Sequence, residues 1–303
     1  MSSEPTVVTP ISAVPAVQPV ARRGISRPTG LYSRILFIVL LVGFTVMFVY
    51  PFVWLLSASL KSATEVFNNT LIPDPPRWQN YPSLVDRAPV ISWLWNSIIV
   101  SFLAAITVTL SSALVAFAFA YFRFPGRSLL FGVVLGTLLL PGAVTMIPTF
   151  LIWDALGFNN SLVPLWAGNL FGSAFYIFLL RQFFLTLPRE LFDAARVDGA
   201  GHLRIWWSIA LPLTRAALIV VFVFELKAAW TDLFKPLIFL RDVAFYTLPR
   251  GLKAIIDNPS IGGEKHWELL AVGGVIVTVP MLVVFFLAQR YFLEGIATTG
   301  SKG

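Results

Sequence analysis

One long apolar stretch of the sequence, residues 216–240, contains four ionisable side chains: Glu225, Lys227, Asp232 and Lys235. Glu225, Asp232 and Lys235 are seven and three positions apart, so in a helix of 3.6 residues per turn they fall within one broad stripe. Charged groups in apolar surroundings are energetically expensive and usually face a cavity or one another. Carboxylates can accept hydrogen bonds from the hydroxyl groups of a polar solute, and a lysine suits an anionic or phosphorylated one. We therefore expect these three residues to contact a solute.

Two further residues extend this candidate solute path. Trp230, on the same predicted helix, offers an aromatic face for the apolar side of a ring, and Asn96 stands at the head of another apolar stretch. Pro236 should kink or end the helix at Lys235, because its ring clashes with the carbonyl of Asp232 and disfavours helical geometry in the preceding residue. Two alternatives stay open: an Asp232–Lys235 pair that touches no solute, and an ordinary interfacial amide at Asn96.

The most polar segment between two apolar stretches is Leu187–Leu213, LPRELFDAARVDGAGHLRIWWSIALPL. Pro188 suits the first turn of a helix, Glu190 favours a helix N-terminus, and Gly199 is placed to end the helix. The segment therefore predicts a helix, a glycine turn and a second helix. A short face of small residues on the first helix suits the close docking of a partner. The alternative is an amphipathic helix on a membrane surface, with Trp206–Trp207 at the interface.

The sequence offers no catalytic machinery. It has no cysteine, which excludes thiolate nucleophiles, disulfides and Cys-based metal sites. It also lacks the G-x-x-x-x-G-K-[ST], H-E-x-x-H and G-x-S-x-G motifs. The two histidines, His202 and His266, fall on opposite sides of the membrane in the topology given below and cannot pair. We expect no catalytic residue, no metal site and no cofactor bound by this chain.

The elements that must position these residues are membrane-spanning helices. Hydrophobic residues make up 57% of the 303 and charged residues only 12%, against about 25% charged in an average soluble domain. A bilayer core needs about 20 apolar residues in helical form. The sequence predicts an all-α, polytopic fold with six transmembrane helices. The expected spans are Ile35–Leu56, Ile98–Tyr121, Leu129–Trp153, Leu162–Leu180, Ala216–Leu240 and Leu269–Ala288.

The distribution of charge predicts the topology. With the N-terminus inside, the inside segments hold most of the 22 Lys and Arg residues, so both termini are expected in the cytoplasm. The longer loops Lys61–Trp93 and Arg241–Glu268 then lie outside. The formal charge of +7 does not indicate nucleic-acid binding, because the basic residues are scattered between spans. Residues 1–30, rich in Pro, Val and Ser, are expected to be a disordered cytoplasmic tail, and residues 31–303 one transmembrane domain.

The polar loop resembles the EAA loop of binding-protein-dependent ABC transporter permeases. The pattern of that family is Glu-Ala-Ala, a glycine four residues on, and an Ile-x-Leu-Pro ending. Asp193 departs from the usual Glu, which keeps the charge and shortens the side chain by one methylene. The residues that stand at the places of the pattern are Asp193, Ala194, Ala195, Gly199, Ile209, Leu211 and Pro212.

Other segments extend the resemblance over nearly everything after residue 30. Ser59–Tyr81 is similar to the outer loop after the first span of sugar permeases, and Leu287–Gly303 is similar to the C-terminus of maltose-type permeases. Trp230–Phe239 resembles the fifth span of the family, with Thr231 in place of a common Asn and Lys235 in place of a common aromatic residue. These segments narrow the resemblance to permeases of the carbohydrate-uptake type.

The resemblance implies an ABC importer transmembrane-domain fold with a cytoplasmic coupling helix, in a bacterial inner (plasma) membrane. It implies a permease subunit that forms the translocation path for a sugar, an oligosaccharide or a related polyol. The implied partners are a second homologous permease in a heterodimer, a dimer of ATPase subunits that binds ATP and Mg, an extracytoplasmic solute-binding protein, and membrane lipid. The implied ATPase-coupling residues are Glu190 and the seven residues of the EAA-like pattern.

Alternative functions remain open from the sequence. An ABC permease for a non-sugar small solute would keep the same coupling loop. A self-sufficient secondary transporter would use the charges of residues 216–240 as an ion relay, and it would predict related halves of the chain and no need for the polar loop. A membrane scaffold would need no charged stripe. Only the ABC permease predicts that an ATPase co-purifies with the chain.

Overall fold

The computed structural model describes residues 30–257 and 266–299, with side chains up to residue 291, and its regular elements in these ranges are all helical. The chain divides into two compact units, Met1–Pro51 and Phe52–Gly303. The described part of the first unit is the N-terminal part of α1 (Leu31–Ser59) with Gly30 before it. The second unit holds the last turns of α1 and the other helices. The tail predicted for residues 1–30 lies, except for Gly30, outside the described residues.

Three helices are long and apolar enough to cross a membrane unbroken: α1, α3 (Val90–Tyr121) and α14 (Trp267–Thr299), the last over Trp267–Tyr291. Three further pairs of helices meet at a bend, and with each pair counted as one span the described chain has six. Hydropathy had predicted this number. The apolar window of α1 contains no buried residue, as expected for a helix surrounded by lipid or by other membrane helices.

The third span is broken, and the prediction of one helix over residues 129–153 was wrong. It consists of α4 (Arg127–Gly136), a 3-10 turn η1 (Thr137–Leu139) and α5 (Gly142–Ala155), with a bend of 101°. Leu140 is extended (ψ 117°) because it precedes Pro141, which disfavours helical geometry in the preceding residue. The chain therefore turns sharply within its apolar stretch.

The fourth span bends by 41° between α6 (Val163–Trp166) with η2 (Ala167–Phe171) and α7 (Ala174–Phe184). Gly172 lies at the bend with a φ of 78°, a conformation that disfavours residues with a Cβ. A Cβ at this position would also lie 3.3 Å from Ser112 Oγ of α3. The bend is therefore set by glycine and packed closely against α3.

The fifth span ends earlier than predicted. Helix α11 (Arg215–Thr231) stops before Asp232, which is extended (ψ 124°), and α12 (Phe234–Phe239) follows. Lys235 is helical, so the break predicted there was misplaced. Pro236 still explains the break, because the residue four positions before it is Asp232, the one whose carbonyl the proline ring would meet in a continuous helix.

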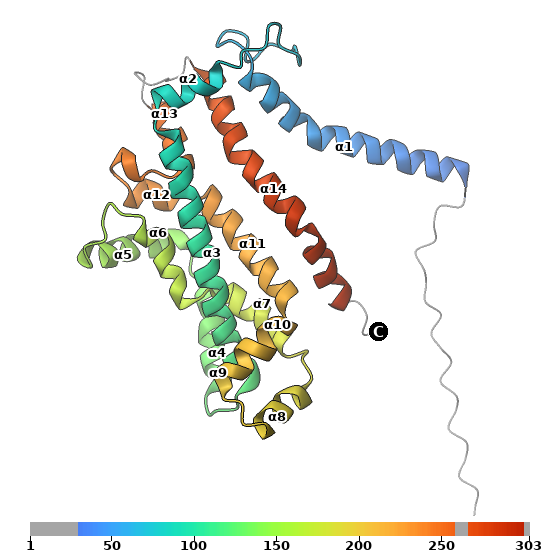
Figure 1. Ribbon diagram of the computed structural model, residues 1–303, viewed down its shortest axis with the longest axis vertical. Helices are drawn as coiled ribbons and strands as arrows, with labels where there is room; N and C mark the ends of the chain where they lie inside the picture. The colour runs from blue at the N-terminus through green and yellow to red at the C-terminus, as the bar shows by residue number, and fades with distance from the viewer. Residues whose placement is uncertain (1–29, 258–265, 300–303) are drawn as a thin grey trace, which may run out of the picture. The chain divides into compact units, whose positions relative to one another are not determined.

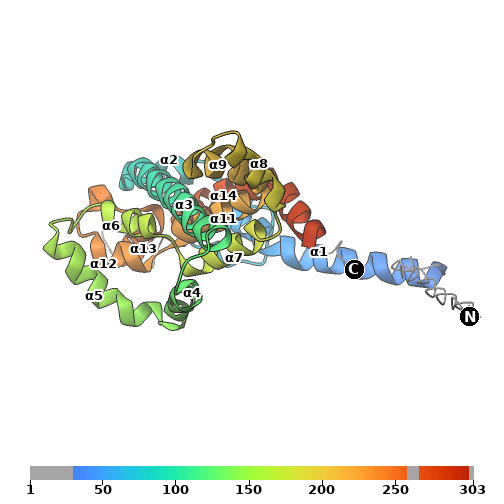
Figure 2. The same ribbon diagram turned by 90° about the horizontal axis from the view of Figure 1, so that it is seen from below.

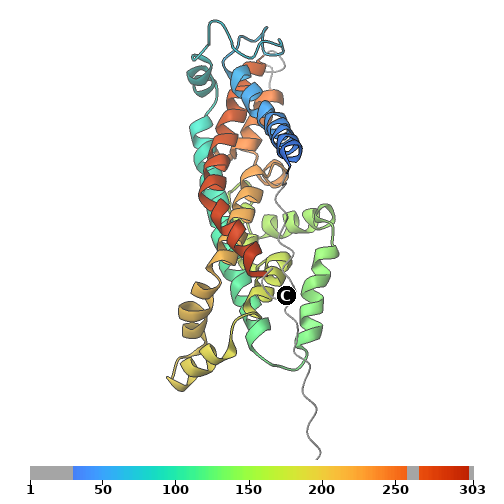
Figure 3. The same ribbon diagram turned by 90° about the vertical axis from the view of Figure 1, so that its right-hand side faces the viewer.

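The polar loop forms α8 (Arg189–Val197), then α9 (His202–Ile205), a π-helical turn η3 (Trp206–Ala210) and α10 (Leu211–Leu213). An 83° bend at Thr214 joins this second half to α11. The helix–glycine turn–helix prediction is confirmed. Figures 1 and 3 show α8 and α9 at one end of α3, while α2 (Asn80–Arg87) and α13 (Leu248–Asp257) lie near the other end.

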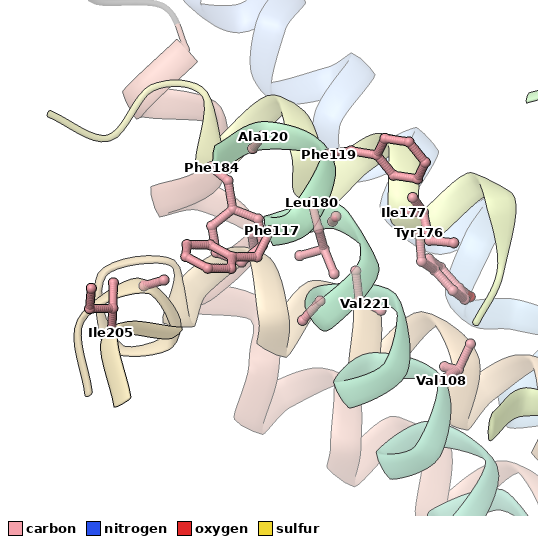
Figure 4. Packing of buried hydrophobic residues seen from close by; sticks show 14 of the residues in the cluster. Val108, Phe117, Phe119, Ala120, Tyr176, Ile177, Leu180, Phe184, Ile205 and Val221 are labelled. Carbon is pink, nitrogen blue, oxygen red and sulfur yellow. The ribbon is translucent and has the colours of Figure 1, made fainter. Parts of the chain in front are cut away.

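Helix α3 is the centre of the second unit, where it packs along α7 and α11. Four of its alanines are wholly buried, so the backbones approach closely, as small residues allow between membrane helices. Toward the α8 end, aromatic and aliphatic side chains of α3, α7 and α9 close around them (Figure 4). Figure 2 shows α4 and α5 to one side of this α3–α7–α11 group. The four alanines are Ala104, Ala105, Ala113 and Ala116.

Candidate functional site

Helix α8 has well-defined ends. Pro188 precedes it in an extended conformation (ψ 129°), and Glu190 lies in the first turn, where a carboxylate favours the helix dipole. At the other end Gly199 has a φ of 78°. The Gly199 N–H donates to the Arg196 carbonyl (3.0 Å) and the Ala200 N–H to the Ala195 carbonyl (2.9 Å). These two bonds define a Schellman motif, which satisfies the last carbonyls of the helix and fixes the turn.

One aromatic residue anchors α8 to the membrane bundle. Phe192 is buried, with its ring centroid 6.1 Å from that of Phe117 and 5.4 Å from that of Tyr121, both on α3. Ile205 of α9 is wholly buried in the same cluster, where Figure 4 labels it together with Phe117. The loop is therefore packed onto the end of α3. Because this packing is close, α8 cannot move unless α3 moves with it.

The outward face of α8 has no partner in the described chain. Val197 is 88% exposed, and on the neighbouring helix Leu203 is 71% exposed. Asp193 and Ala194 are exposed beside them, and Ala195 is half-buried. This surface is small, partly apolar and exposed, and the helix that carries it is fixed to the bundle by Phe192. Such surfaces are typical of sites that dock a protein partner.

The second half of the loop returns to the bundle. Ile209 and Leu211 are half-buried and pack against the cluster that holds Phe192, and Pro212 is exposed. Trp206 packs against the same cluster, while Trp207 is exposed. The structure thus gathers the eight predicted coupling residues into one continuous segment beyond the end of α3. The predicted membrane-surface role of the two tryptophans stays untested.

Glu225, Asp232 and Lys235 line one cavity of about 160 Å³. Asp232 Oδ1 accepts hydrogen bonds from the backbone N–H of Phe234 (2.9 Å) and of Lys235 (3.3 Å), so this carboxylate caps α12. Lys235 is exposed to the cavity, and in the described residues it forms no ion pair with Asp232. The other residues that line the cavity are Val100, Leu165, Glu225, Ala228, Ala229 and Pro236.

Sequence reasoning missed the partners of Glu225. Asn169 Nδ2 donates to Glu225 Oε1 (2.6 Å) and to the Ala104 carbonyl of α3 (3.3 Å). The Asn169 backbone carbonyl accepts from Ser111 Oγ of α3 (2.9 Å). The carboxylate therefore ties α11 to the bend of the fourth span. Two features of the sequence pointed to this region, an amide within an apolar stretch and a glycine three residues later.

Two predicted solute-path residues lie elsewhere. Trp230 is buried and donates its indole N–H to the Val277 carbonyl of α14 (3.0 Å), so it joins two helices and does not line the cavity. Asn96 donates to the carbonyls of Ala244 and Tyr246, each at 2.9 Å, and so fastens the loop before α13. The structure brings together Glu225, Asp232 and Lys235 and leaves out Trp230 and Asn96.

These features define a class. The chain is a polytopic helical membrane protein with a polar cavity in its bundle and a protruding helix at one end. Within the described residues no three His, Cys, Asp or Glu side chains lie close enough together to hold a metal ion. The geometry is that of a transport subunit, which supplies a path and a docking helix.

Comparison with known proteins gives the family. Residues 112–297 match the model of the binding-protein-dependent transport system inner membrane component. The chain belongs to this family and is a permease subunit of an ABC importer, a non-catalytic, multi-pass component of the inner membrane. The family works with a solute-binding protein, and ABC transporters include an ATPase. The predicted recognition, fold class and lack of enzymatic role are therefore confirmed.

Relatives and solved structures agree with this assignment. The sn-glycerol-3-phosphate transport system permease protein UgpE of Yersinia enterocolitica is 34% identical over 267 residues, which are 86% of this chain and 94% of that protein. UgpE of Brucella suis is 32% identical over 271 residues, 86% of this chain and 95% of that protein. A chain of a bacterial ABC transporter for the acidic polysaccharide alginate has the same fold, with a TM-score of 0.76 at 24% identity over 87% of this chain and 98% of that one.

Proposed function

We propose that this permease forms, with a second homologous permease, the path for a sugar, a polyol or a phosphorylated polyol. In the proposed complex Leu187–Leu213 couples the path to a separate dimer of ATPase subunits, which binds ATP and Mg. Both termini and α8 lie in the cytoplasm, and an extracytoplasmic binding protein delivers the solute at the α13 end. The observation that carries the proposal is the exposed face of α8, held out from the bundle by its buried Phe192.

The proposed coupling has a mechanical basis in the packing. Phe192 connects α8 to α3, and the bend at Thr214 connects the second half of the loop to α11. The two helices that receive these connections pack along one another. A partner that pulls α8 therefore acts on both α3 and α11, and α11 leads to the cavity that Glu225 and Lys235 line.

The cavity supports the choice of solute class. Two carboxylates and one ammonium group within one cavity can hold hydroxyl groups and one anionic group of a small solute. Among the residues that the structure describes, Lys235 is the one basic side chain that lines this cavity. A phosphorylated polyol fits this arrangement, and relatives 34% identical are sn-glycerol-3-phosphate permeases.

Gly199→Trp should uncouple the transporter. The left-handed turn projects from the bundle, with nothing within 4 Å of a Cβ at this position, so the indole would enter the docking surface. We expect solute-stimulated ATP hydrolysis in proteoliposomes to fall about tenfold, the effect of overpacking a well-fitted contact. The measurement uses the whole transporter, with ATPase retention followed by co-purification.

Gly157→Trp is the matched control for that variant. Gly157 has a φ of 79° and open space around its Cβ position, but it lies between α5 and α6. It carries the same backbone strain without touching α8. Equal losses in both variants would mean that strain, not docking, caused the defect. Unchanged hydrolysis in Gly199→Trp would leave the loop as a membrane-surface helix only.

Lys235→Met should weaken the response to an anionic solute. The variant removes one charge-assisted hydrogen bond, so the concentration of sn-glycerol 3-phosphate that half-maximally stimulates ATP hydrolysis should rise about tenfold. Lys227→Met is the control, because Lys227 lies on α11 but lines a different, apolar groove. A solute response that both lysine variants leave intact would contradict the proposed path. If Lys235→Met raised the half-maximal concentration about tenfold for a neutral sugar and left that of sn-glycerol 3-phosphate unchanged, a phosphorylated polyol would be excluded as the solute.

A further inference from the structure

A second polar cavity lies between the end of α3 and α8. Its volume is about 430 Å³, within the size range of small-molecule sites. Tyr121, Phe122 and His202 form its aromatic part, with the Phe122 and His202 ring centroids 4.9 Å apart. Its charged residues are Arg123, Arg189, Asp193 and Arg196. The solute path does not include this cavity, and of the residues named above on the outward docking face only Asp193 also lines it.

The cavity carries an excess of positive charge. Arg189, Asp193 and Arg196 recur at intervals of four and three residues, so they form one stripe along α8, and Arg123 faces them from the end of α3. In the described residues none of these arginines forms an ion pair. Three guanidinium groups with five N–H donors each therefore stand against a single carboxylate. Such an arrangement favours an anion with several acceptor oxygens.

A phosphate group matches this chemistry. Planar guanidinium groups bind phosphate oxygens through two parallel hydrogen bonds, and arginine is preferred where that geometry matters. A bound phosphate would link α8 to the chain just beyond α3, because Arg189 and Arg196 belong to α8 and Arg123 lies two residues after the last residue of α3. It would stiffen the connection that the proposed coupling requires.

The position of the cavity indicates the source of the phosphate. Arg123 directly follows Phe122, the residue that ends the α3 span, so the cavity lies at the level of the lipid headgroups. A narrow crevice next to it shares Tyr121 and Arg189 and is otherwise lined by apolar side chains. Exposed Leu185 lies at that crevice, and an acyl chain placed there would cover it. A soluble anion would need no apolar neighbour.

We propose that this cavity binds the phosphate headgroup of an anionic phospholipid of the cytoplasmic leaflet. The proposal rests on the orientation given above, in which α8 is cytoplasmic. Basic pockets beside transmembrane helices on this side of a membrane are known to bind anionic headgroups. An anionic lipid would then be a structural ligand of the coupling loop.

The test compares three forms of the complete transporter: wild type, Arg123→Gln and Arg204→Gln. Arg204 lies on α9, is exposed and does not line the cavity, so its variant makes the same charge change without altering the cavity lining. Each complex is purified from membranes of equal phosphatidylglycerol and phosphatidylcholine content, and native mass spectrometry measures the retained lipid. Inorganic phosphate is then titrated by calorimetry in detergent. ATPase co-purification is recorded for all three.

We expect retention of phosphatidylglycerol to fall about tenfold in Arg123→Gln and to stay unchanged in Arg204→Gln, with no change in ATPase content. Equal retention in all three forms would overturn the site. Calorimetric binding of phosphate that Arg123→Gln weakens, without lipid retention, would overturn the lipid source. Loss of the ATPase from Arg123→Gln alone would assign the arginine to the ATPase contact instead. A wild type without ATPase would refute the proposed function, whatever lipid it retains.

Discussion

Gly251→Ala should prevent stable folding of the permease. Gly251 lies in α13, and a Cβ at this position would stand 2.1 Å from Cε3 and 2.3 Å from Cδ2 of the Trp93 ring. The indole cannot retreat, because it is 1% exposed and donates its N–H to the Val243 carbonyl (2.9 Å). Overpacking of this kind destabilises a fold by about 1–3 kcal/mol or more. We expect little intact protein in the membrane, measured by quantitative blotting and by protease resistance.

Substitutions at two other glycines provide comparison variants with smaller expected effects. A Cβ on Gly273 would stand 2.3 Å from Leu252 Cδ2, the far end of a flexible side chain that can move, so Gly273→Ala should lose much less protein. A Cβ on Gly168 would have nothing within 4 Å, and Gly168→Ala should accumulate like wild type. Equal accumulation of the three variants would contradict the close packing of α13 on α3.

Local signals in the sequence were sufficient for the coupling loop. A proline before the helix, a carboxylate in its first turn and a glycine after its last turn each act within a few residues, so α8 and its turn could be predicted. Long apolar stretches were likewise sufficient for the number of spans. Both kinds of signal depend only on residues that are close together in the chain, so they can be read from one sequence.

Bends in the spans could not be predicted from proline alone. Pro141 coincides with a 101° break, whereas Pro51, Pro148 and Pro280 lie inside the helices α1, α5 and α14. Whether a membrane helix bends at proline depends on which neighbouring groups satisfy the freed carbonyls. That information resides in the packing between helices and in no local pattern.

The candidate solute path shows the same limit at the level of side chains. Trp230 and Asn96 have the chemistry of sugar-binding residues, but their hydrogen-bond donors reach backbone carbonyls 47 and about 150 positions away. Residue type predicts what a side chain can bind. The fold decides whether another part of the chain binds it first. Glu225, a predicted solute-path residue that lines the cavity, likewise has a partner 56 positions away.

Asn169→Leu should destabilise the bundle through that partner. The variant leaves Glu225 without its 2.6 Å hydrogen bond, within an apolar part of the membrane domain. Loss of a hydrogen bond to a charged group lowers the free energy of unfolding by about 2 kcal/mol. We therefore expect the midpoint of thermal unfolding in nanodiscs to fall by about 4–8 °C. Asn159→Leu is the control, because Asn159 donates to Asp154 in the same way (2.7 Å) but at an exposed site. That variant should leave the midpoint nearly unchanged.

The double variant Asn169→Leu, Glu225→Leu separates an unsatisfied carboxylate from a simple loss of contact. If the cost of Asn169→Leu is the unpaired charge, removing the charge as well should recover most of the midpoint, since replacing both partners by apolar groups is nearly neutral. Solute-stimulated ATP hydrolysis should not recover, because Glu225 also lines the cavity. A double variant as unstable as the single one would mean that the Asn169 side chain acts through its hydrogen bond to the Ala104 carbonyl of α3, and not through Glu225.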